Sequence, residues 1–539
     1  MQTKSLDNNV RKALQELAKQ DLKNGIKSRF KQDSARVSKF NHNVAGLYID
    51  FSKTHISEEM MEHYLKLAQS CDLIKKRHAL FSGEPINITE NRSVLHPLLR
   101  DPQNQGIETV EPELLNVAND AQQQLLKQCE EIQKLLSTRS KLVTDIIHIG
   151  IGGSFLGTQL LFEAGVDTKN KINIHFISNI DAHKLVRVFD QCEPDTTIVI
   201  GVSKTFSTAE TLQNIHTVYD WYKENNINDY QQYFYAVTAN YQNAIDFGID
   251  SQNIVTFPEW VGGRYSVWSS VSLSAVLVLG IKKFQEFLAG AAFLDKHFYQ
   301  TDLKDNICFI AASLDHYYAN FMQAGSRAIF AYDSRLGSLV DYLQQLETES
   351  NGKDRQIDGS NVDQKTSPVI WGGVGTDVQH SVFQMLHQGT SLIPAEFIII
   401  KKPDHDLPEH HIELLANAIA QSAALLEGQD IETVKKIHVE DGLTEEVQNA
   451  KVFSGERPSC TLVLEQLSPY LLGILLAFYE HRTFCSGVIN NINSFDQMGV
   501  ELGKRLAKQV KPLLAEKSIS TNDESFDNST LELISKLKA

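Results

Sequence analysis

The chain has 539 residues, a formal charge of −16 and 42% hydrophobic residues. Its length predicts more than one domain, and its composition excludes both a disordered chain and a protein made of apolar membrane helices. The acidic excess argues against nucleic acid as a partner, because binding a phosphate backbone needs a basic surface. A small anionic ligand is still allowed, since nearby cations rather than net charge decide whether phosphate binds. We therefore expect a globular cytoplasmic protein.

The sequence of the first 110 residues predicts mostly helical structure. A helix is expected over Val10–Phe30, and the apolar strand candidate is Leu47–Phe51. The six cysteines of the whole chain are dispersed without a C-x-x-C pair, so we expect reduced thiols and neither disulfides nor a zinc site.

From Val143 onward, short β-rich runs alternate with amphipathic helical stretches, which indicates a parallel α/β sheet. Helices are expected over Thr158–Glu163 and Ala209–Tyr222, and an apolar helix over Trp268–Leu279 follows the last strand. The expected strands are Ile146–Ile151, Ile172–Ser178, Thr197–Val202, Tyr233–Thr238 and Ile254–Phe257.

A second series of strands and helices predicts a second open sheet. Its expected strands are Ala328–Tyr332, Pro368–Trp371, Ala395–Ile400 and Thr461–Glu465, and its expected helices are Ser338–Ser350, Gln379–Gln388, His411–Glu427 and Pro469–Thr483. A polar connector over Ser518–Ser529 leads to a terminal helix, Thr530–Lys538, which Ser529 is expected to cap.

The first candidate ligand loop is Ile149–Ser154, with the sequence I-G-I-G-G-S, between a strand and a helix. Glycines there let backbone N–H groups approach an anion, and a helix N-terminus adds positive potential. A tight turn without a ligand is the alternative. Phe155 stands where a dinucleotide fingerprint needs its third glycine, but Asp181 after the next strand keeps a dehydrogenase interpretation open.

The second candidate loop is Ser203–Thr208, with the sequence S-K-T-F-S-T, again between a strand and a helix. Its hydroxyls, one ammonium and the N–H groups of a helix start would suit a phosphate dianion. A plain helix cap by Ser207 or Thr208 explains one hydroxyl but not the whole group.

Other motifs offer catalytic groups. Arg264 follows a glycine pair, and its guanidinium would stabilise an enediolate or hold a carboxylate. Glu347 and Glu349 end an acidic helix and point to nearly opposite faces of it, so only one can act as a general base at the sheet edge. His380 and Lys504 are candidate proton-transfer groups. Each also has an ordinary interpretation as a polar side chain without a catalytic role.

The histidine-rich segment Asp404–His411 matches no standard zinc spacing. We interpret it as a solvated loop before a helix and expect no metal.

In this order and spacing, the motifs resemble the glucose-6-phosphate isomerase family from about residue 40 to 510. The resemblance also covers Gly83–His96, Glu349–Lys353 and the pattern F-D-Q-x-G-V-E-x-x-K over Phe495–Lys504. It departs from the family at Thr348, where methionine is usual, and at Met498, where tryptophan is common.

The resemblance implies an α/β fold with two αβα sandwich domains of the sugar-isomerase type, mostly parallel sheets and a helical C-terminal tail. The smaller domain is expected over residues 113–280, the larger discontinuous domain over 1–112 and 281–513, and the tail over 514–539. It also implies a homodimer with shared active sites.

The implied reaction is the reversible isomerisation of glucose 6-phosphate and fructose 6-phosphate in glycolysis and gluconeogenesis, through ring opening and a cis-enediolate, without a cofactor. Glu349 matches the base that moves a proton between C1 and C2, and Arg264 matches the group that stabilises the enediolate. Lys504 and His380 match ring-opening groups, with His380 expected from the partner subunit. The implied substrate-binding residues are Gly153, Ser154, Ser203, Lys204, Thr205, Thr208, Gln345 and Gln497.

Two other classes of function stay open. A non-catalytic phosphosugar-binding regulator would need only the two ligand loops, and a nicotinamide-dependent oxidoreductase would need the dinucleotide fingerprint. The set Arg264, Glu349, His380 and Lys504 favours the enzyme, because binding alone does not require a base positioned at carbon.

Overall fold

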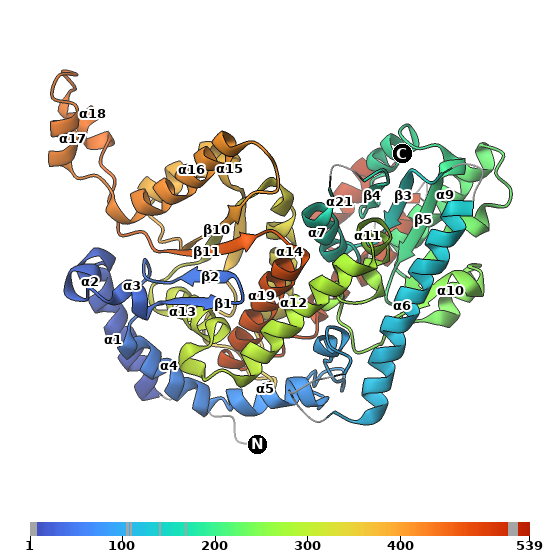
Figure 1. Ribbon diagram of the computed structural model, residues 1–539, viewed down its shortest axis with the longest axis horizontal. Coiled ribbons are helices and arrows are strands. Elements are labelled where there is room, and N and C mark those ends of the chain that lie inside the picture. The colour runs from blue at the N-terminus through green and yellow to red at the C-terminus, as the bar shows by residue number, and fades with distance from the viewer. Residues whose placement is uncertain are drawn as a thin grey trace. The chain divides into compact units, whose positions relative to one another are not determined.

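The computed structural model describes residues 8–103, 107, 110–138, 142–167, 170–515 and 526–538 (Figure 1). It divides into one unit that ends at Ser494 and another that begins at Phe495, and each is described by itself. Among the described residues, no helix has the length and hydropathy needed to cross a bilayer.

A five-stranded parallel sheet is built from the middle of the chain, in the order β4-β3-β5-β6-β7. Each of the five strands predicted for this region is confirmed, with small shifts at the ends. Their bounds are β3 (Asp145–Ile149), β4 (Asn173–Ile177), β5 (Thr197–Val202), β6 (Phe234–Thr238) and β7 (Ile254–Thr256).

Helices cover both faces of this sheet. On one face, Val199 and Ala236 of the strands pack with Val218 and Tyr222 in a buried core. The helices that contribute to this core are α8 (Ala182–Phe189), α9 (Ala209–Glu224) and α10 (Tyr241–Phe247). On the other face lie α6 (Pro112–Thr138), α7 (Leu156–Gly165) and α11 (Leu273–Leu279), which contact one another or the sheet. The arrangement is an αβα sandwich.

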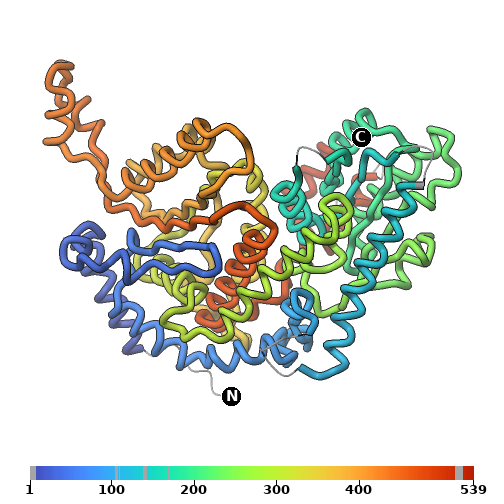
Figure 2. The backbone as a smooth tube through the Cα atoms, viewed as in Figure 1, coloured from blue at the N-terminus to red at the C-terminus, as the bar shows by residue number. Residues whose placement is uncertain are grey.

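A six-stranded mixed sheet has the order β1-β2-β11-β10-β8-β9. It combines early and late parts of the first unit, and the early part is the blue tube that runs beside an orange segment in Figure 2. The four later strands are parallel, whereas the N-terminal hairpin of β1 and β2 runs antiparallel to β11. The bounds are β1 (Asn41–Val44), β2 (Leu47–Asp50), β8 (Ser326–Tyr332), β9 (Val369–Val374), β10 (Ala395–Lys402) and β11 (Ser459–Gln466). The sequence predicted every one of these strands except β1.

The second sheet is also covered on both faces. Phe330 and Phe397 of the strands pack with Phe383 and Ala418, which lie on α15 (Gly375–Gln388) and α16 (Pro408–Glu427). Helices on the opposite face are α12 (Ile281–Gln300), α13 (Ile307–Phe321) and α19 (Pro469–Ile489). α12 and α19 pack so closely that a Cβ on Gly473 would lie 2.0 Å from the carbonyl oxygen of Phe287.

Several predicted helices differ from the observed ones, and one of them is interrupted at a glycine with positive φ. The helix expected over Val10–Phe30 is interrupted at Gly25, where φ is 71°. The apolar helix expected from Trp268 begins only at Leu273 and ends before Gly280, where φ is 89°. The remaining helices of the first unit, apart from α14, are α1 (Asn8–Asn24), α2 (Ile26–Gln32), α3 (Arg36–Lys39), α4 (Glu58–Ser70), α5 (Leu73–Ser82), α17 (Ile431–Ile437) and α18 (Glu445–Ala450).

The second unit contains the helices α20 (Glu501–Ala515) and α21 (Asn528–Leu537). The terminal helix is therefore confirmed, but the prediction that Ser529 caps it is wrong. Asp527 is the cap, and its Oδ1 accepts a hydrogen bond of 3.1 Å from the backbone N–H of Thr530. Most of the expected connector Ser518–Ser529 lies outside the described residues.

Candidate active site

The loop Ser203–Thr208 follows the carboxyl end of β5 and precedes α9. Ser203 Oγ lies 3.1 Å from Thr208 Oγ1, and Ser207 Oγ donates to Thr205 Oγ1 at 2.8 Å. Thr208 occupies the cap position of α9, but in the described structure its hydroxyl makes no capping hydrogen bond. The helix-cap alternative therefore does not account for these hydroxyls, which cluster with one another at the positive end of α9.

Lys204 joins this loop to the segment that carries Arg264. Its Nζ donates a hydrogen bond of 3.0 Å to the carbonyl of Val261. Burial lowers the pKa of Lys204, and the nearby positive charge of Arg92 lowers it further. An ammonium that has lost part of its water and lies beside a second cation is well suited to bind an anion.

The glycine loop after β3 packs backbone to backbone against the same segment. A Cβ on Gly153 would lie only 2.1 Å from the carbonyl carbon of Gly263, so no larger residue fits. Ser266 Oγ donates to the Gly153 carbonyl at 3.1 Å. Gly152 adopts a φ of 57°, and a Cβ there would lie 2.9 Å from Gln345 Nε2. The close backbone approach therefore requires glycine at position 153, and the left-handed backbone conformation favours glycine at position 152.

His148 fixes the far end of the glycine loop and was missed in the sequence analysis. It is fully buried, with Nε2 2.8 Å from the carbonyl oxygen of Ser154 and Nδ1 2.8 Å from Ser274 Oγ. Burial lowers the pKa of His148 to about 4, so the ring is neutral near pH 7. Because a carbonyl only accepts, Nε2 donates to Ser154 and Nδ1 accepts from Ser274. The signal available in the sequence was a lone histidine within an apolar strand.

The turn that carries Glu349 is a π-helical turn, Gln345–Glu349, at the end of α14 (Leu339–Gln344). The sequence predicted one continuous helix over this range. Single π-turns inside helices are frequent at functional sites. Glu347 and Glu349 point to opposite sides, as expected, because Glu347 pairs with Arg327 whereas Glu349 faces Arg264.

Glu349 is held between an amide and a guanidinium. Gln345 Nε2 donates to Glu349 Oε2 at 2.8 Å, and Arg264 Nη1 lies 3.6 Å from Glu349 Oε1. The guanidinium of Arg264 is buried, and it donates from Nε to Ser350 Oγ at 2.6 Å and from Nη2 to the Ser494 carbonyl at 2.7 Å. Glu349 keeps 23% of its side chain exposed, so it is fixed in direction yet open to a ligand.

The structure thus brings Gly153, Arg264, Gln345 and Glu349 together, and it connects Lys204 to them through Val261. Such a set can bind an anion, accept a proton at a carboxylate and stabilise a developing oxyanion with a fixed cation.

His380 lies on α15, in a different helical layer of the chain from the turn that carries Glu349. Its neighbour Gln379 accepts a hydrogen bond of 2.8 Å from the hydroxyl of Tyr332, whereas Glu347, on the turn of Glu349, pairs with Arg327. Arg327 and Tyr332 are separated by an odd number of residues on β8, so their side chains leave the strand on opposite faces. The helix of the exposed His380 and the turn of Glu349 therefore lie on opposite faces of β8.

Gln497 and Lys504 belong to the second unit, and their roles stay predictions. Lys504 is an exposed residue of α20 whose Nζ lies 3.1 Å from Glu501 Oε1.

Asp181, the residue that kept the dehydrogenase interpretation open, has a structural role. Asp181 caps α8, because its Oδ1 accepts a hydrogen bond of 3.0 Å from the backbone N–H of His183.

One group among the described residues has the composition of a metal site. Ligand atoms of Asp145, His175 and Cys192 lie within 4.8 Å of one another. They already have protein partners, since Asp145 accepts from His175 Nε2 and Thr144 Oγ1, each at 2.7 Å. Burial also raises the pKa of the Cys192 thiol to about 12, which disfavours the thiolate that a metal would need. The segment Asp404–His411 was predicted to be a loop, but residues 408–411 are the start of α16, and Asp404 pairs with Arg335.

The chain is an α/β protein in which helices cover both faces of two mostly parallel sheets, and polar loops lie at the carboxyl edge of one of these sheets. The family model "Phosphoglucose isomerase" matches residues 50–534. The chain is 40% identical over 523 residues to glucose-6-phosphate isomerase of Chlorobium phaeobacteroides, covering 95% of this chain and 93% of the relative. It is 42% identical over 510 residues to the enzyme of the same name from Zymomonas mobilis, covering 94% of each.

A solved structure of glucose-6-phosphate isomerase from Chlamydia trachomatis superposes with a TM-score of 0.85 at 30% identity and covers 99% of both chains. A hypothetical protein from Thermus thermophilus, 22% identical with a TM-score of 0.63, shares the fold. This chain belongs to the phosphoglucose isomerase family.

Proposed function

We propose that this chain catalyses the reversible interconversion of glucose 6-phosphate and fructose 6-phosphate, the activity for which its relatives are named. The observation that carries the proposal is a carboxylate, Glu349, held between Gln345 and the buried Arg264 beside an anion-binding loop. Ser203, Lys204, Thr205 and Thr208 bind the phosphate.

With the phosphate held in that loop, Glu349 removes the proton from one of the two carbons C1 and C2 and returns it to the other. Arg264 stabilises the negative charge that develops on the enediolate oxygens, because a buried, always-charged guanidinium needs no reorganisation. Gly153 and Ser154 contact the sugar. Gln345 and Gln497 contact the ligand, and Lys504 assists ring opening.

The test is to incubate the purified protein with fructose 6-phosphate and to measure glucose 6-phosphate. The proposal includes no metal or cofactor, so turnover should survive dialysis against EDTA. A folded protein that forms no glucose 6-phosphate refutes the enzyme and leaves the phosphosugar-binding regulator, which would bind the sugar phosphate but would not exchange its C2 hydrogen with solvent.

We also propose that the enzyme works as a homodimer with shared active sites in the cytoplasm, within glycolysis and gluconeogenesis. Within one chain, His380 and Glu349 belong to layers on opposite faces of β8, which supports the assignment of His380 to the site of a second copy. Its role there is to open the sugar ring.

Mixing inactive Glu349→Gln subunits with inactive His380→Ala subunits tests this arrangement. If subunits exchange, each mixed dimer should regain one complete site, and activity should reappear. No recovery after verified exchange would assign both residues to one chain.

The two sheets support the domain assignment made from the sequence. We propose a smaller domain over residues 113–280, which contains β3–β7, and a larger one over 1–112 and 281–513, which contains β1, β2 and β8–β11. Residues 514–539 form the tail.

A further inference from the structure

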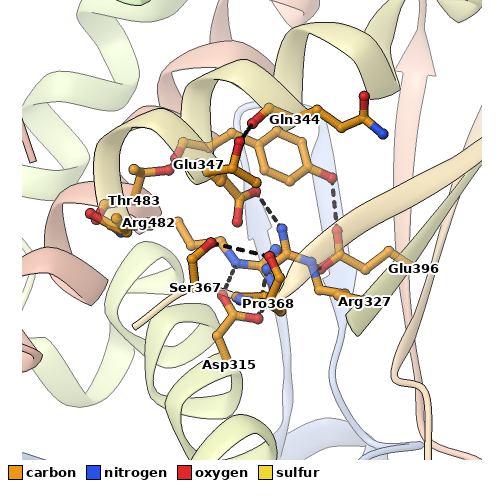
Figure 3. Close-up of polar contacts among 12 residues, drawn as sticks. Asp315, Arg327, Gln344, Glu347, Ser367, Pro368, Glu396, Arg482 and Thr483 are labelled. Carbon is orange, nitrogen blue, oxygen red and sulfur yellow. Dashed lines mark hydrogen bonds and ion pairs between the residues drawn. The ribbon is translucent and has the colours of Figure 1, made fainter. Parts of the chain in front are cut away.

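A buried ionic cluster lies on the Glu347 side of the π-helical turn (Figure 3). Arg327 pairs with Glu347, with Asp315 at 2.7 Å and with Glu396 at 3.2 Å. Arg482 pairs with the same Asp315 at 2.7 Å and with Glu396 at 2.6 Å. No member of the cluster has more than 9% of its side chain exposed.

The cluster ties the turn to four other elements. Asp315 lies on α13, Arg327 on β8, Glu396 on β10 and Arg482 on α19, and only Glu347 belongs to the turn. Buried ion pairs give little net stability, because removing the charges from water costs about as much as their attraction returns. Their better supported use is to specify one conformation. Because Glu347 connects this cluster to the turn, the cluster is suited to fix the conformation of the turn.

The cluster holds three carboxylates and two guanidiniums. Burial raises the pKa of Glu347, with Arg327 opposing this shift and Asp315 and Glu396 adding to it. The direction follows mainly from burial, which disfavours the charged form of the carboxyl group. Burying the Glu347 carboxylate therefore costs free energy. This cost indicates that the position of Glu347 in the turn is important.

Glu347 lies within the turn that orients Glu349. The turn holds Glu349 through Gln345 Nε2 at 2.8 Å, so Gln345 and Glu349 move together if the turn rewinds. If the turn took up the α-helical i→i+4 hydrogen-bond pattern in place of the i→i+5 pattern, the residues that follow would be rotated about the helix axis. Such a rotation would move the Glu349 carboxylate away from Arg264.

We propose that Glu347 is a positioning residue, whose bond to Arg327 holds the π-helical turn in the register that aims Glu349 at Arg264 and the bound sugar. The inference rests on the proposed isomerase function and adds to it a residue that touches neither substrate nor reacting atoms. The length of the Glu347 side chain is therefore the property that matters.

The test shortens that side chain while keeping its charge. Glu347→Asp withdraws the carboxylate by one carbon–carbon bond, so either the turn shifts or the bond to Arg327 is lost. A misplacement of about 1 Å at a reacting group costs about 10²-fold in rate. We expect kcat to fall by between about 10-fold and 10²-fold, while KM and the Kd of a phosphorylated inhibitor change by less than about threefold.

Glu396→Asp is the matched control, because it makes the same change in the same cluster at a residue outside the turn. It should lower thermal stability to a similar degree while kcat stays within about twofold of the wild type. Glu347→Gln is the rescue variant, since its amide oxygen keeps the length and still accepts from Arg327. It should keep kcat within about threefold even if it lowers stability.

Equal kcat losses in Glu347→Asp and Glu396→Asp would overturn the proposal, since they would indicate general loosening of the core. An unchanged kcat in folded Glu347→Asp would also overturn it. If Glu347→Asp does not fold, a kcat loss of more than about tenfold in Glu347→Gln overturns it instead. A wild-type protein without isomerase activity would refute the proposed function itself, which is a separate outcome.

Discussion

Replacing Gly153 by alanine would add one methyl group where two backbone segments of the site touch. The new Cβ would lie 2.1 Å from the carbonyl carbon of Gly263, 2.2 Å from its oxygen and 2.6 Å from the backbone nitrogen of Arg264. All three are backbone atoms, so no side chain can turn away. The loops must separate by about 1 Å to reach an ordinary contact, which begins at 3.4 Å.

That separation moves Arg264, whose Nη1 lies 3.6 Å from Glu349 Oε1. A shift of about 1 Å at a catalytic group costs about 10²-fold in rate, or about 2.7 kcal/mol of transition-state stabilisation. We expect kcat of Gly153→Ala for fructose 6-phosphate to fall by about 10²-fold in a coupled assay of glucose 6-phosphate. The free energy of unfolding should fall by about 1–3 kcal/mol, as at other overpacked sites.

Gly262→Ala is the control in the facing segment. Its φ of −72° suits any residue, and its added Cβ would meet the Tyr265 ring at 3.4 Å, an ordinary contact. It should change kcat by less than about threefold. A folded Gly153→Ala protein with wild-type kcat would show that this close approach does not position Arg264.

Three further substitutions test other parts of the site. Lys204→Ala removes one charge-assisted hydrogen bond, worth about 1.5–3 kcal/mol, so calorimetry should find a phosphorylated inhibitor bound one to two powers of ten more weakly; an unchanged Kd would place the phosphate elsewhere. Glu349→Gln should lower turnover by about 10²–10⁴-fold and stop exchange of the C2 hydrogen while inhibitor binding persists, and turnover at the wild-type rate would exclude Glu349 as the base. His148→Gln should flatten the acid side of the stability profile, measured by urea unfolding at about pH 4.5 and about pH 7. The pKa of His148 is near 6.5 in the unfolded chain and about 4 in the folded protein, so the unfolded chain binds the proton first as pH falls. The free energy of unfolding of the wild type should therefore fall by up to about 3 kcal/mol between these two pH values and return as pH rises. Equal pH dependence of the free energy of unfolding in wild type and His148→Gln would contradict this.

The sequence predicted the elements whose signal is local. The strand Thr197–Val202 was predicted with its exact bounds because a β-branched run ends at a polar loop, and the same loop is the proposed phosphate site. The paired carboxylates were also separated correctly in direction, since neighbours two apart on a helix point to opposite faces.

What the sequence did not predict depends on contacts between distant segments. β1, with the polar sequence Asn41–Val44, becomes a strand only because it pairs with β2, which in turn pairs with β11 about four hundred residues later. The π-helical turn at Glu349 has no periodicity of its own that differs from an α-helix over so few residues. Its two glutamates pair with Arg327 and Arg264, which come from elsewhere in the chain.

Glu347 and Glu349 show how environment divides the work of two like residues. Glu347 is buried with Arg327 in a cluster where its charge is costly and its position is fixed. Glu349 is partly exposed, and its two oxygens face one amide and one guanidinium that leave it open to a ligand. A general base must be oriented by its partners and still be able to accept a proton. Glu349 meets this condition better than Glu347, because its contact to Arg264 is a longer one of 3.6 Å. In the proposed mechanism, the tightly paired Glu347 therefore positions the turn, and the less tightly held Glu349 moves the proton.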